Sequence, residues 1–370
     1  MEIHTPSTHK IDFVDRGKFS PFPVDPLPSL ELNPIVSIIT RTKDRPLLLK
    51  RAFESVLKQT YSNWQHIIVN DGGSSVLVEE VVKLFLDRYA GRLKLVHNPI
   101  SLGMEEAANI GIRHATGNLF TIHDDDDTWH PDFLKECVSF LSDPSNSSQF
   151  GGVVTHASLI RERIDGDDVV ILSEEDFNSH HKYISLFEVA AGNIFTVNSF
   201  VYHRKIWEKI RGYNQHLPVL GDWEFNLRVL STWDLGLIPK RLANYHIRVN
   251  QINDIYSNTV TDPSHLHVHY GNLMRNHFLR DDLRNAKPGL GFIMNTALSF
   301  HRIQDMRYQF DELKFKLQEI SEQLQATKEQ LQVIRPIVTE IQYSVGVLYS
   351  WISKVIAPLR WMKRVMRRLF

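Results

Sequence analysis

Residues 118–131 read NLFTIHDDDDTWHP, an apolar run that ends at His123 and four consecutive aspartates. Such a run predicts a buried strand whose end carries a charged site. Four adjacent carboxylates repel one another at neutral pH unless a divalent cation or a ring of hydrogen-bond donors offsets their charge. Carboxylate oxygens suit Mg²⁺ or Mn²⁺, and such a cation keeps positions for water and for a substrate phosphate.

The same aspartates have two other interpretations. One is a solvated acidic turn before a helix that Pro131 starts, with Asp127 or Thr128 as its cap. The other is the calcium loop of an EF-hand, which needs Gly at its sixth position. Counting from Asp124, that position is Trp129, so the EF-hand is excluded.

Apolar runs and helical spacings alternate on the N-terminal side of this stretch. Strands are predicted at residues 35–40, 65–69, 93–97 and 119–122, and helices at residues 46–59, 78–86 and 104–115. The alternation predicts a parallel sheet covered on both faces, and ligands bind beyond the carboxyl ends of such strands. Function is therefore expected at the residues that follow the strand ends, which are Arg41, Lys43, Asp44, Asp71 and the four aspartates.

Length and composition limit the classes of function. A chain of 370 residues can hold a core domain of about 200 to 300 residues with appendages. The 42 Lys and Arg residues balance 43 Asp and Glu residues, so nucleic acid is not an expected partner. The single cysteine, Cys137, excludes an internal disulfide and favours a reducing compartment. We recognise no signal peptide in residues 1–10 and no apolar stretch that suits a transmembrane helix.

The C-terminal side of the aspartates has a less regular pattern. Residues 152–157 and 169–172 flank a turn-like segment, which predicts a hairpin, and Gly221 begins a predicted helix. Alternating histidines occur at positions 265, 267 and 269. They would share one face and could bind a metal only on a strand, whereas on a helix or loop they are ordinary surface residues. The proline-rich residues 1–33 predict an extended linker.

Five motifs follow one another between about residues 34 and 250. They are VSIITRTKDR (36–45), NDG (70–72), LG with N-x-GI and A-x-G (102–117), DDDD with Pro131, and GDW (221–223). Together they resemble glycosyltransferase family 2. The resemblance implies a GT-A domain over residues 34–300, which is an α/β fold with a Rossmann-like mixed sheet and helices on both faces. It also implies a metal-dependent, inverting enzyme that transfers a sugar from a nucleotide sugar, with UDP-sugar favoured.

The resemblance further implies roles for single residues. Asp71 matches the residue that reads the base, Asp124 and Asp125 the ribose side of the D-x-D motif, Asp126 the metal carboxylate, and Asp222 the catalytic base. The competing interpretation of Asp222 is the N-cap of the helix that runs through Leu227.

The chain departs from the family pattern in three places, one of which is Ala108, where many relatives have Arg before Asn109. Thr40-Arg41-Thr42-Lys43 stands where many relatives have Pro-Thr-Tyr-Asn, so Thr40 and Arg41 are expected to contact the donor. In residues 245–248 the family's Tyr-Arg-x-His reads Tyr-His-Ile-Arg, with the basic residues exchanged. We therefore expect Arg248 at the diphosphate and His246 at the metal.

The chemistry of the reaction agrees with these assignments. Breaking a sugar–phosphate bond builds negative charge on the departing nucleoside diphosphate, which a bound cation stabilises. Inversion needs a carboxylate that takes the proton of the attacking acceptor hydroxyl. The expected acceptor is a glycan or a lipid-linked glycan in the synthesis of a surface polysaccharide such as O-antigen. Two alternatives stay open: a catalytically silent GT-A scaffold, and a nucleotidyltransferase, which usually carries a Gly-rich phosphate loop.

The C-terminal third predicts a different structure. Apolar residues step by four and three from Leu313 to Val355, which predicts a coiled coil over residues 308–350, interrupted at Pro336, and hence a homo-oligomer. A lone helix that folds back on the catalytic domain is the alternative. Residues 351–370 predict a basic amphipathic helix that lies on an anionic membrane, or else binds a partner protein. The expected location is therefore the cytoplasmic, inner face of the cell membrane.

Overall fold

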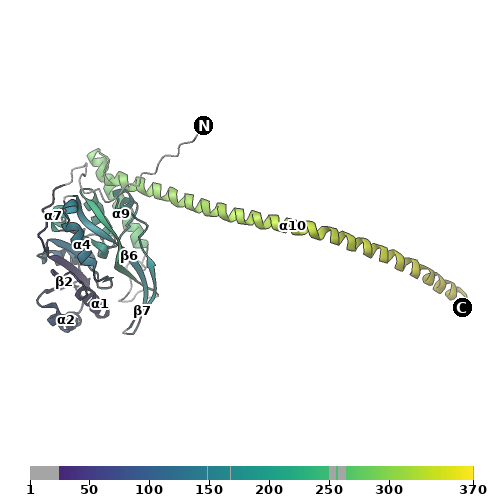
Figure 1. Cartoon of the computed structure of the whole chain (residues 1–370), viewed down its shortest axis with the longest axis horizontal. Helices are drawn as coiled ribbons and strands as arrows, with labels where there is room; N and C mark the ends of the chain where they lie inside the picture. The colour runs from purple at the N-terminus through teal and green to yellow at the C-terminus, as the bar shows by residue number, and fades with distance from the viewer. Residues whose placement is uncertain (1–24, 148, 167, 250–255, 257–263, 370) are drawn as a thin grey trace, which may run out of the picture. The chain divides into compact units, whose positions relative to one another are not determined.

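The structure is a computed structural model that describes residues 25–147, 149–166, 168–249, 256 and 264–369 (Figure 1). The chain divides into two units, one that ends at Ser299 and one that begins at Phe300. The first unit contains the sheet and its helices. The second consists of most of helix α10 (Leu290–Leu369).

The first part of the chain alternates strands and helices as the sequence predicts. Its elements are β1 (Val36–Thr42), α1 (Pro46–Leu57), β2 (Trp64–Asp71), α2 (Ser75–Tyr89), β3 (Leu93–Asn98), α3 (Met104–Arg113) and β4 (Leu119–Ile122). Local signals set these bounds: Pro46 is the first residue of α1, and the Ser74 side chain caps α2 by accepting from the amide of Leu77.

The later part of the chain is more irregular. Its elements are β5 (Thr128–Trp129), α4 (Phe133–Ser142), α5 (Pro144–Ser147), β6 (Phe150–Asp165), β7 (Asp168–Asp176), α6 (Leu186–Ala191), the 3-10 turn η2 (Val197–Ser199), β8 (Phe200–His203), α7 (Arg204–Ile210), α8 (Gly221–Leu230), β9 (Asp234–Arg248) and α9 (Ser264–Asn285). The predicted hairpin is β6 with β7, which pair antiparallel.

The strands of the described residues join one nine-stranded sheet in the order β3-β2-β1-β4-β8-β6-β9-β5, with β7 paired to β6. Strands β1 to β4 are parallel, whereas β8 runs antiparallel to both β4 and β6. The sheet is therefore mixed, and the parallel sheet predicted from the alternation is only its first half. In Figure 1, β2 and α2 lie at one side of this unit and β7 at the other, which agrees with the strand order.

The sheet is buried on both faces. Ile38 and Ile39 are adjacent in β1 and fully buried, yet they belong to different apolar clusters because successive strand residues point to opposite faces. One cluster includes buried residues of α3, α6 and α8, and the other includes residues of α1, α2 and α4. The second cluster contains Cys137, whose side chain is fully buried. These clusters hold the strand ends, and thus the site, in place.

Two sequence-based interpretations fail in this unit. Helix α4 begins at Phe133 after Asp132, so neither Asp127 nor Thr128 caps it. The histidines at 265, 267 and 269 lie in α9, where alternating residues do not share a face. They therefore do not form the metal site that a strand would have allowed.

Helix α10 continues through Pro336 and Pro358, so the predicted interruption at Pro336 is not a break in the helix. Its side chains from residue 301 to residue 358 are exposed. The coiled coil over residues 308–350 and the membrane-surface helix over residues 351–370 stay predictions. No described helix combines the length and the apolar character that a membrane crossing requires. Of the predicted linker, residues 25–33 contain no helix or strand, and residues 1–24 lie outside the described part.

Candidate active site

The ends of β1, β2 and β4 and the beginning of α8 line a cavity of about 490 Å³. Five of the site residues expected from the sequence lie on its wall: Arg41, Asp71, Asp124, Asp126 and Asp222. Thr40, Asp125, His246 and Arg248 do not line it. Thr40 is fully buried, and its hydroxyl bonds to the backbone carbonyl of His123 and to the His66 ring. The strand ends therefore meet at one site, as expected, but not every residue after them faces it.

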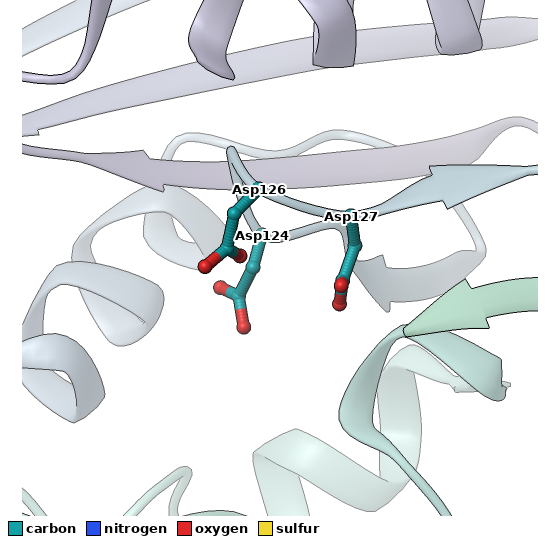
Figure 2. A group of neighbouring side chains, drawn as sticks. All are labelled: Asp124, Asp126 and Asp127. Atoms are coloured by element: carbon teal, nitrogen blue, oxygen red, sulfur yellow. The ribbon is translucent and has the colours of Figure 1, made fainter. Parts of the chain in front are cut away.

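Asp124, Asp126 and Asp127 form a carboxylate cluster at this cavity. One carboxylate oxygen of each lies within 4.8 Å of the others, and Figure 2 shows the three side chains pointing to the same side of the chain. All three residues line the cavity, which leaves room for water and phosphate ligands. Because clustered carboxylate oxygens are the donors that Mg²⁺ and Mn²⁺ prefer, these residues fit a divalent cation.

Arginines neutralise two members of the carboxylate cluster. The Arg41 guanidinium donates to both oxygens of Asp124, with Nε–Oδ1 and Nη2–Oδ2 distances of 2.8 Å. Asp126 accepts from Arg248 and, at 3.4 Å, from Arg45. Although burial opposes ionisation, these arginines hold the pKa of Asp126 below its ordinary value. A cation bound here would therefore share its ligands with guanidinium groups.

The other two aspartates of the run are more deeply buried. Asp125 points away from the cavity and pairs with Arg45, with an Nη2–Oδ1 distance of 2.6 Å. Burial raises the pKa of Asp125 to about 6. Asp127 accepts from the backbone amide of His246, and burial raises its pKa well above the ordinary value. Asp124 and Asp126 are thus the members of the cluster that offer charged ligands.

Behind the cluster, the buried carboxylate of Glu162 organises the basic residues. Glu162 on β6 and Arg248 on β9 are register partners. Glu162 Oε2 lies 2.6 Å from both Arg51 Nη1 and His246 Nδ1. His246 Nε2 is 2.9 Å from the Thr128 hydroxyl, so both ring nitrogens are engaged and the structure does not bring His246 into the cluster. Its place beside Glu162 instead supports the backbone that holds Asp127.

Asp71 fixes the loop that follows β3. Its carboxylate accepts four hydrogen bonds at 2.8 to 3.0 Å, from Asn98 Nδ2, the Ser101 hydroxyl and the amides of Leu102 and Gly103. Although burial opposes it, these donors lower the pKa of Asp71. Four bonds fill the capacity of a carboxylate. Asp71 therefore shapes the cavity rim through this loop and has no spare acceptor in this structure.

Asp222 lies in the first turn of α8 and faces the cavity. The N-cap is Leu220, so the capping interpretation of Asp222 does not hold. Asn193 Nδ2 donates to Asp222 Oδ2 at 2.8 Å, and the amide of Trp223 donates to Oδ1 at 2.8 Å. Burial raises the pKa of Asp222. A fixed carboxylate with a raised pKa is a suitable general base.

The comparison with protein families decides the assignment. The profile described as Glycosyl transferase family 2 matches residues 37–209, which include the carboxylate cluster. Through this region the chain belongs to glycosyl transferase family 2. The mixed sheet with helices on both faces fits a GT-A fold, and a helical C-terminal segment follows it, so the fold predicted from the sequence is confirmed.

Curated relatives of this glycosyltransferase come from several bacteria. An uncharacterised glycosyltransferase of Haemophilus influenzae is 24% identical over 62% of this chain and 70% of its own length. A putative colanic acid biosynthesis glycosyl transferase of Escherichia coli is 39% identical over 34% of this chain and 42% of its own length. A PGL/p-HBAD biosynthesis glycosyltransferase of Mycobacterium tuberculosis is 26% identical over 63% and 83% of the two chains. The match to the Escherichia coli protein thus spans less than half of that relative.

Solved structures are also similar to this glycosyltransferase. TarS of S. aureus, in complex with UDP-GlcNAc, has 14% identity and a TM-score of 0.46 over 61% of each chain. A mannosyltransferase of Pyrobaculum calidifontis, in complex with GDP-Man and Mn²⁺, has 19% identity and a TM-score of 0.44 over 60% of each chain.

Several residues at the site escape sequence reasoning. Arg45 pairs with Asp125 and Asp126, but before Pro46 it resembles an ordinary loop charge. Asn193, which holds Asp222, lies in a segment with no motif. Glu105 lies in the first turn of α3, where acidic residues are common because they interact favourably with the helix dipole. Its position in the sequence therefore does not mark it as a site residue. Their positions depend on contacts between distant segments of the glycosyltransferase.

Proposed function

We propose that this chain catalyses a divalent-metal-assisted, inverting transfer of a sugar from a nucleotide sugar to the hydroxyl of a glycan or lipid-linked acceptor. The observation that carries the proposal is that Asp222 and the carboxylate cluster line the same cavity of about 490 Å³. The names of the relatives, in colanic acid and PGL/p-HBAD biosynthesis, support a role in a surface polysaccharide such as O-antigen. A UDP-sugar is the favoured donor.

Asp222 is the proposed catalytic base. Asn193 and the Trp223 amide orient its carboxylate, and its raised pKa increases its basicity. It would accept the proton of the acceptor hydroxyl while that oxygen attacks the anomeric carbon from the face opposite the leaving group. The product would have the inverted configuration.

Asp124 and Asp126 are the proposed holders of the cation. When bound, a Mg²⁺ or Mn²⁺ ion stabilises the negative charge of the departing diphosphate. Arg41, Lys43 and Arg45 also line the cavity, and their positive charges favour the diphosphate. Arg41 stays in place because Asp124 binds its guanidinium in a bidentate pair.

The aromatic part of the cavity lining suits the sugar of an acceptor. Phe177, Phe195 and Tyr245 line it, and the Phe177 and Tyr245 rings pack edge to face with centroids 5.8 Å apart. The apolar face of a sugar ring packs well against such aromatic surfaces, while Asp222 nearby takes the hydroxyl proton.

Helix α10 supports the proposed assembly and location. The apolar seam that runs through Leu324, Leu331 and Val338 is exposed, as expected of a helix that pairs with a second copy. Farther along, exposed Trp351 and Trp361 accompany basic residues, which suits an anionic membrane surface. We propose a homo-oligomer bound peripherally to the inner face of the cell membrane.

The test is transfer measured with a panel of UDP- and GDP-sugars, with Mg²⁺ or Mn²⁺ and with EDTA. The proposal expects one donor to yield product of inverted configuration and EDTA to abolish turnover. A chain that binds nucleotide sugars without transfer to any glycan acceptor is the silent scaffold. Release of pyrophosphate from a nucleoside triphosphate and a sugar phosphate identifies a nucleotidyltransferase instead.

A further inference from the structure

Glu105 is a buried carboxyl group without a hydrogen bond. It is the second residue of α3 and lines the cavity, with only 5% of its side chain exposed. Neither of its oxygens has a hydrogen-bond partner in the described part of the chain, and Oε2 is completely enclosed. Buried polar groups without partners are rare because each costs free energy. The position therefore needs an explanation that the protein alone does not supply.

Glu105 lies between Arg41, which binds Asp124 of the carboxylate cluster, and Gly221, which precedes the proposed base Asp222. Arg41 Nη1 is its nearest positive group, 3.9 Å from Oε2, which is beyond hydrogen-bond distance. On the other side, a Cβ atom built on Gly221 would lie 2.3 Å from Glu105 Cδ. The carboxyl therefore lies against the residue before Asp222, in the space that a Cβ atom there would occupy. Asp124 and Asp222 are near enough to influence its ionisation.

We propose that Glu105 binds a hydroxyl group of the transferred sugar and selects an uncharged hexose. The inference rests on the proposed function, because it assigns a role to Glu105 in the same cavity. A sugar hydroxyl both donates and accepts, so it satisfies the carboxyl in either protonation state. Burial, together with the charges of Asp222 and Asp124, raises the pKa of Glu105 to about 8, so it would donate to the hydroxyl at neutral pH.

The charge around this position argues against an acidic sugar. The carboxylate of a uronic acid bound here would lie close to Glu105 and near two further carboxyl groups, those of Asp124 and Asp222. Arg41 would not compensate, because Asp124 already binds it in a bidentate pair. The negative charges of Asp124 and Asp222 disfavour a further carboxylate beside them. A site built to bind a hydroxyl also rejects a sugar that lacks it, since its own polar group is then left unpaired.

The experiment compares binding of nucleoside diphosphates and sugar nucleotides to the full chain by calorimetry with Mn²⁺. The probes are UDP, GDP, UDP-glucose, UDP-galactose, UDP-N-acetylglucosamine, UDP-glucuronic acid and GDP-mannose. Glu105→Ala is expected to weaken the best sugar nucleotide about 10- to 100-fold, and Glu105→Gln, which keeps shape and hydrogen bonding, about 3- to 10-fold. Both variants should bind the matching nucleoside diphosphate within about 2-fold of wild type.

Glu106→Gln is the matched control. Glu106 is the next residue of α3, and it binds Arg113 and Asn109 rather than lining the cavity. This variant should leave both kinds of ligand unchanged. Wild type should also bind UDP-glucuronic acid at least about 10-fold more weakly than UDP-glucose, and Glu105→Gln should keep that gap, because Gln is uncharged like the protonated Glu105.

Three results would overturn the inference. Equal weakening of nucleoside diphosphate and sugar nucleotide would mean that Glu105 only supports Arg41. Unchanged sugar-nucleotide binding in Glu105→Ala would mean that no sugar hydroxyl reaches it, and a preference for UDP-glucuronic acid would reject the uncharged sugar. An assay of sugar transfer on the same preparations tests the proposed function separately. A chain that binds sugar nucleotides selectively but does not transfer the sugar would contradict the proposed function and leave the role of Glu105 standing.

Discussion

Ion pairs in the cavity and on helix α10 differ in their burial and in the sequence distance between the partners. In the cavity, Asp126 pairs with Arg248, which lies 122 residues away in the sequence, and both side chains are largely removed from solvent. On α10, Lys316 pairs with Glu312 one helical turn away, and both are exposed. Exposed pairs of this kind contribute little to stability, whereas a buried pair that loses one partner is strongly destabilised. The cavity depends on the whole fold, while α10 depends on its local sequence.

This difference predicts that the two regions are separable. Substitutions in the cavity should change chemistry without changing attachment to membranes, and substitutions at the end of α10 should do the reverse. Each variant below is therefore measured both for turnover and for binding to anionic vesicles.

The largest effect is expected from Asp126→Asn. Loss of a charged ligand removes several kcal/mol of stabilisation of the departing diphosphate, which corresponds to about three to five orders of magnitude in turnover. Metal-dependent binding of a UDP-sugar should be lost, while vesicle binding stays unchanged. Calorimetry with and without EDTA checks this, and tight binding that ignores EDTA would contradict it.

Asp126→Ala is a poorer probe of the same role. It would leave the buried guanidinium of Arg248 without its partner on Asp126, and removal of one member of a buried pair costs about 3 to 5 kcal/mol. Thermal unfolding should show this loss for alanine and less of it for the isosteric Asn. Asp87→Asn, an exposed change on α2, is the control and should affect neither stability nor turnover.

Asp222→Asn should lower turnover by about two to four orders of magnitude, the usual contribution of a general base. Donor affinity should stay within a few fold, because Asn keeps the shape of the side chain and leaves the carboxylate cluster intact. The exposed Asp234→Asn serves as the control. Steady-state kinetics would show Asp222 to be merely structural if the Asn variant kept wild-type turnover.

The reverse test is deletion of residues 351–370. Basic residues near an anionic surface and inserted Trp side chains act together, so the deletion should reduce partition onto anionic vesicles at least about a hundredfold at low salt. Turnover on a soluble acceptor should not change. Light scattering should still detect an oligomer, because the predicted coiled coil ends at residue 350.

A charge-only variant sharpens the deletion test. Replacement of Lys363, Arg364 and Arg367 by Gln keeps a helix-forming sequence and removes positive charge. It should weaken vesicle binding, as should high salt on the intact chain, because exposed charges are screened beyond about 8 to 10 Å. Intact protein that ignores anionic vesicles at low salt would reject the membrane role.

The smallest effect is expected from Glu105→Gln on stability. Burial, with the charges of Asp222, Asp124 and Glu224, raises the pKa of Glu105 from 4.5 to about 8, against the lowering effect of Arg41. Between these pH values the folded chain keeps a proton that the unfolded chain releases, so wild type loses stability as pH rises through this window. Gln has no such proton. The variant should therefore lose less stability than wild type as the pH rises from 4.5 to 8.5, seen as a smaller fall in Tm.

The sequence predicted the first half of the sheet because its signals are local. Apolar runs, helical spacings and caps lie within each element, and β4 was predicted at its observed bounds, Leu119–Ile122. The antiparallel pairing of β8 was not foreseen, because its four residues carry no pattern that reveals their pairing partners. The mixed sheet entered the prediction only through the resemblance to the family.

The site was predictable in position but not in detail. Parallel strand ends share one edge, which brought Arg41, Asp124 and Asp126 together. Asp125 is buried against Arg45 because the aspartates form a turn between β4 and β5, and a turn does not alternate its side chains as a strand does. The surroundings of His246 depend on the pairing of β6 with β9, which places it beside Glu162, 84 residues away. No motif in a single segment encodes that pairing.

Because its single cysteine is buried, the protein can be labelled selectively at an introduced cysteine. The Cys137 side chain is fully enclosed in the apolar cluster, and burial raises the pKa of its thiol well above the ordinary value. Thiol reagents react with exposed thiolates, so they do not modify Cys137 in the folded chain. A cysteine introduced at an exposed position such as Leu331 is then the one reactive thiol of the molecule, ready for a cross-linker or a spin label without any prior removal of native cysteines.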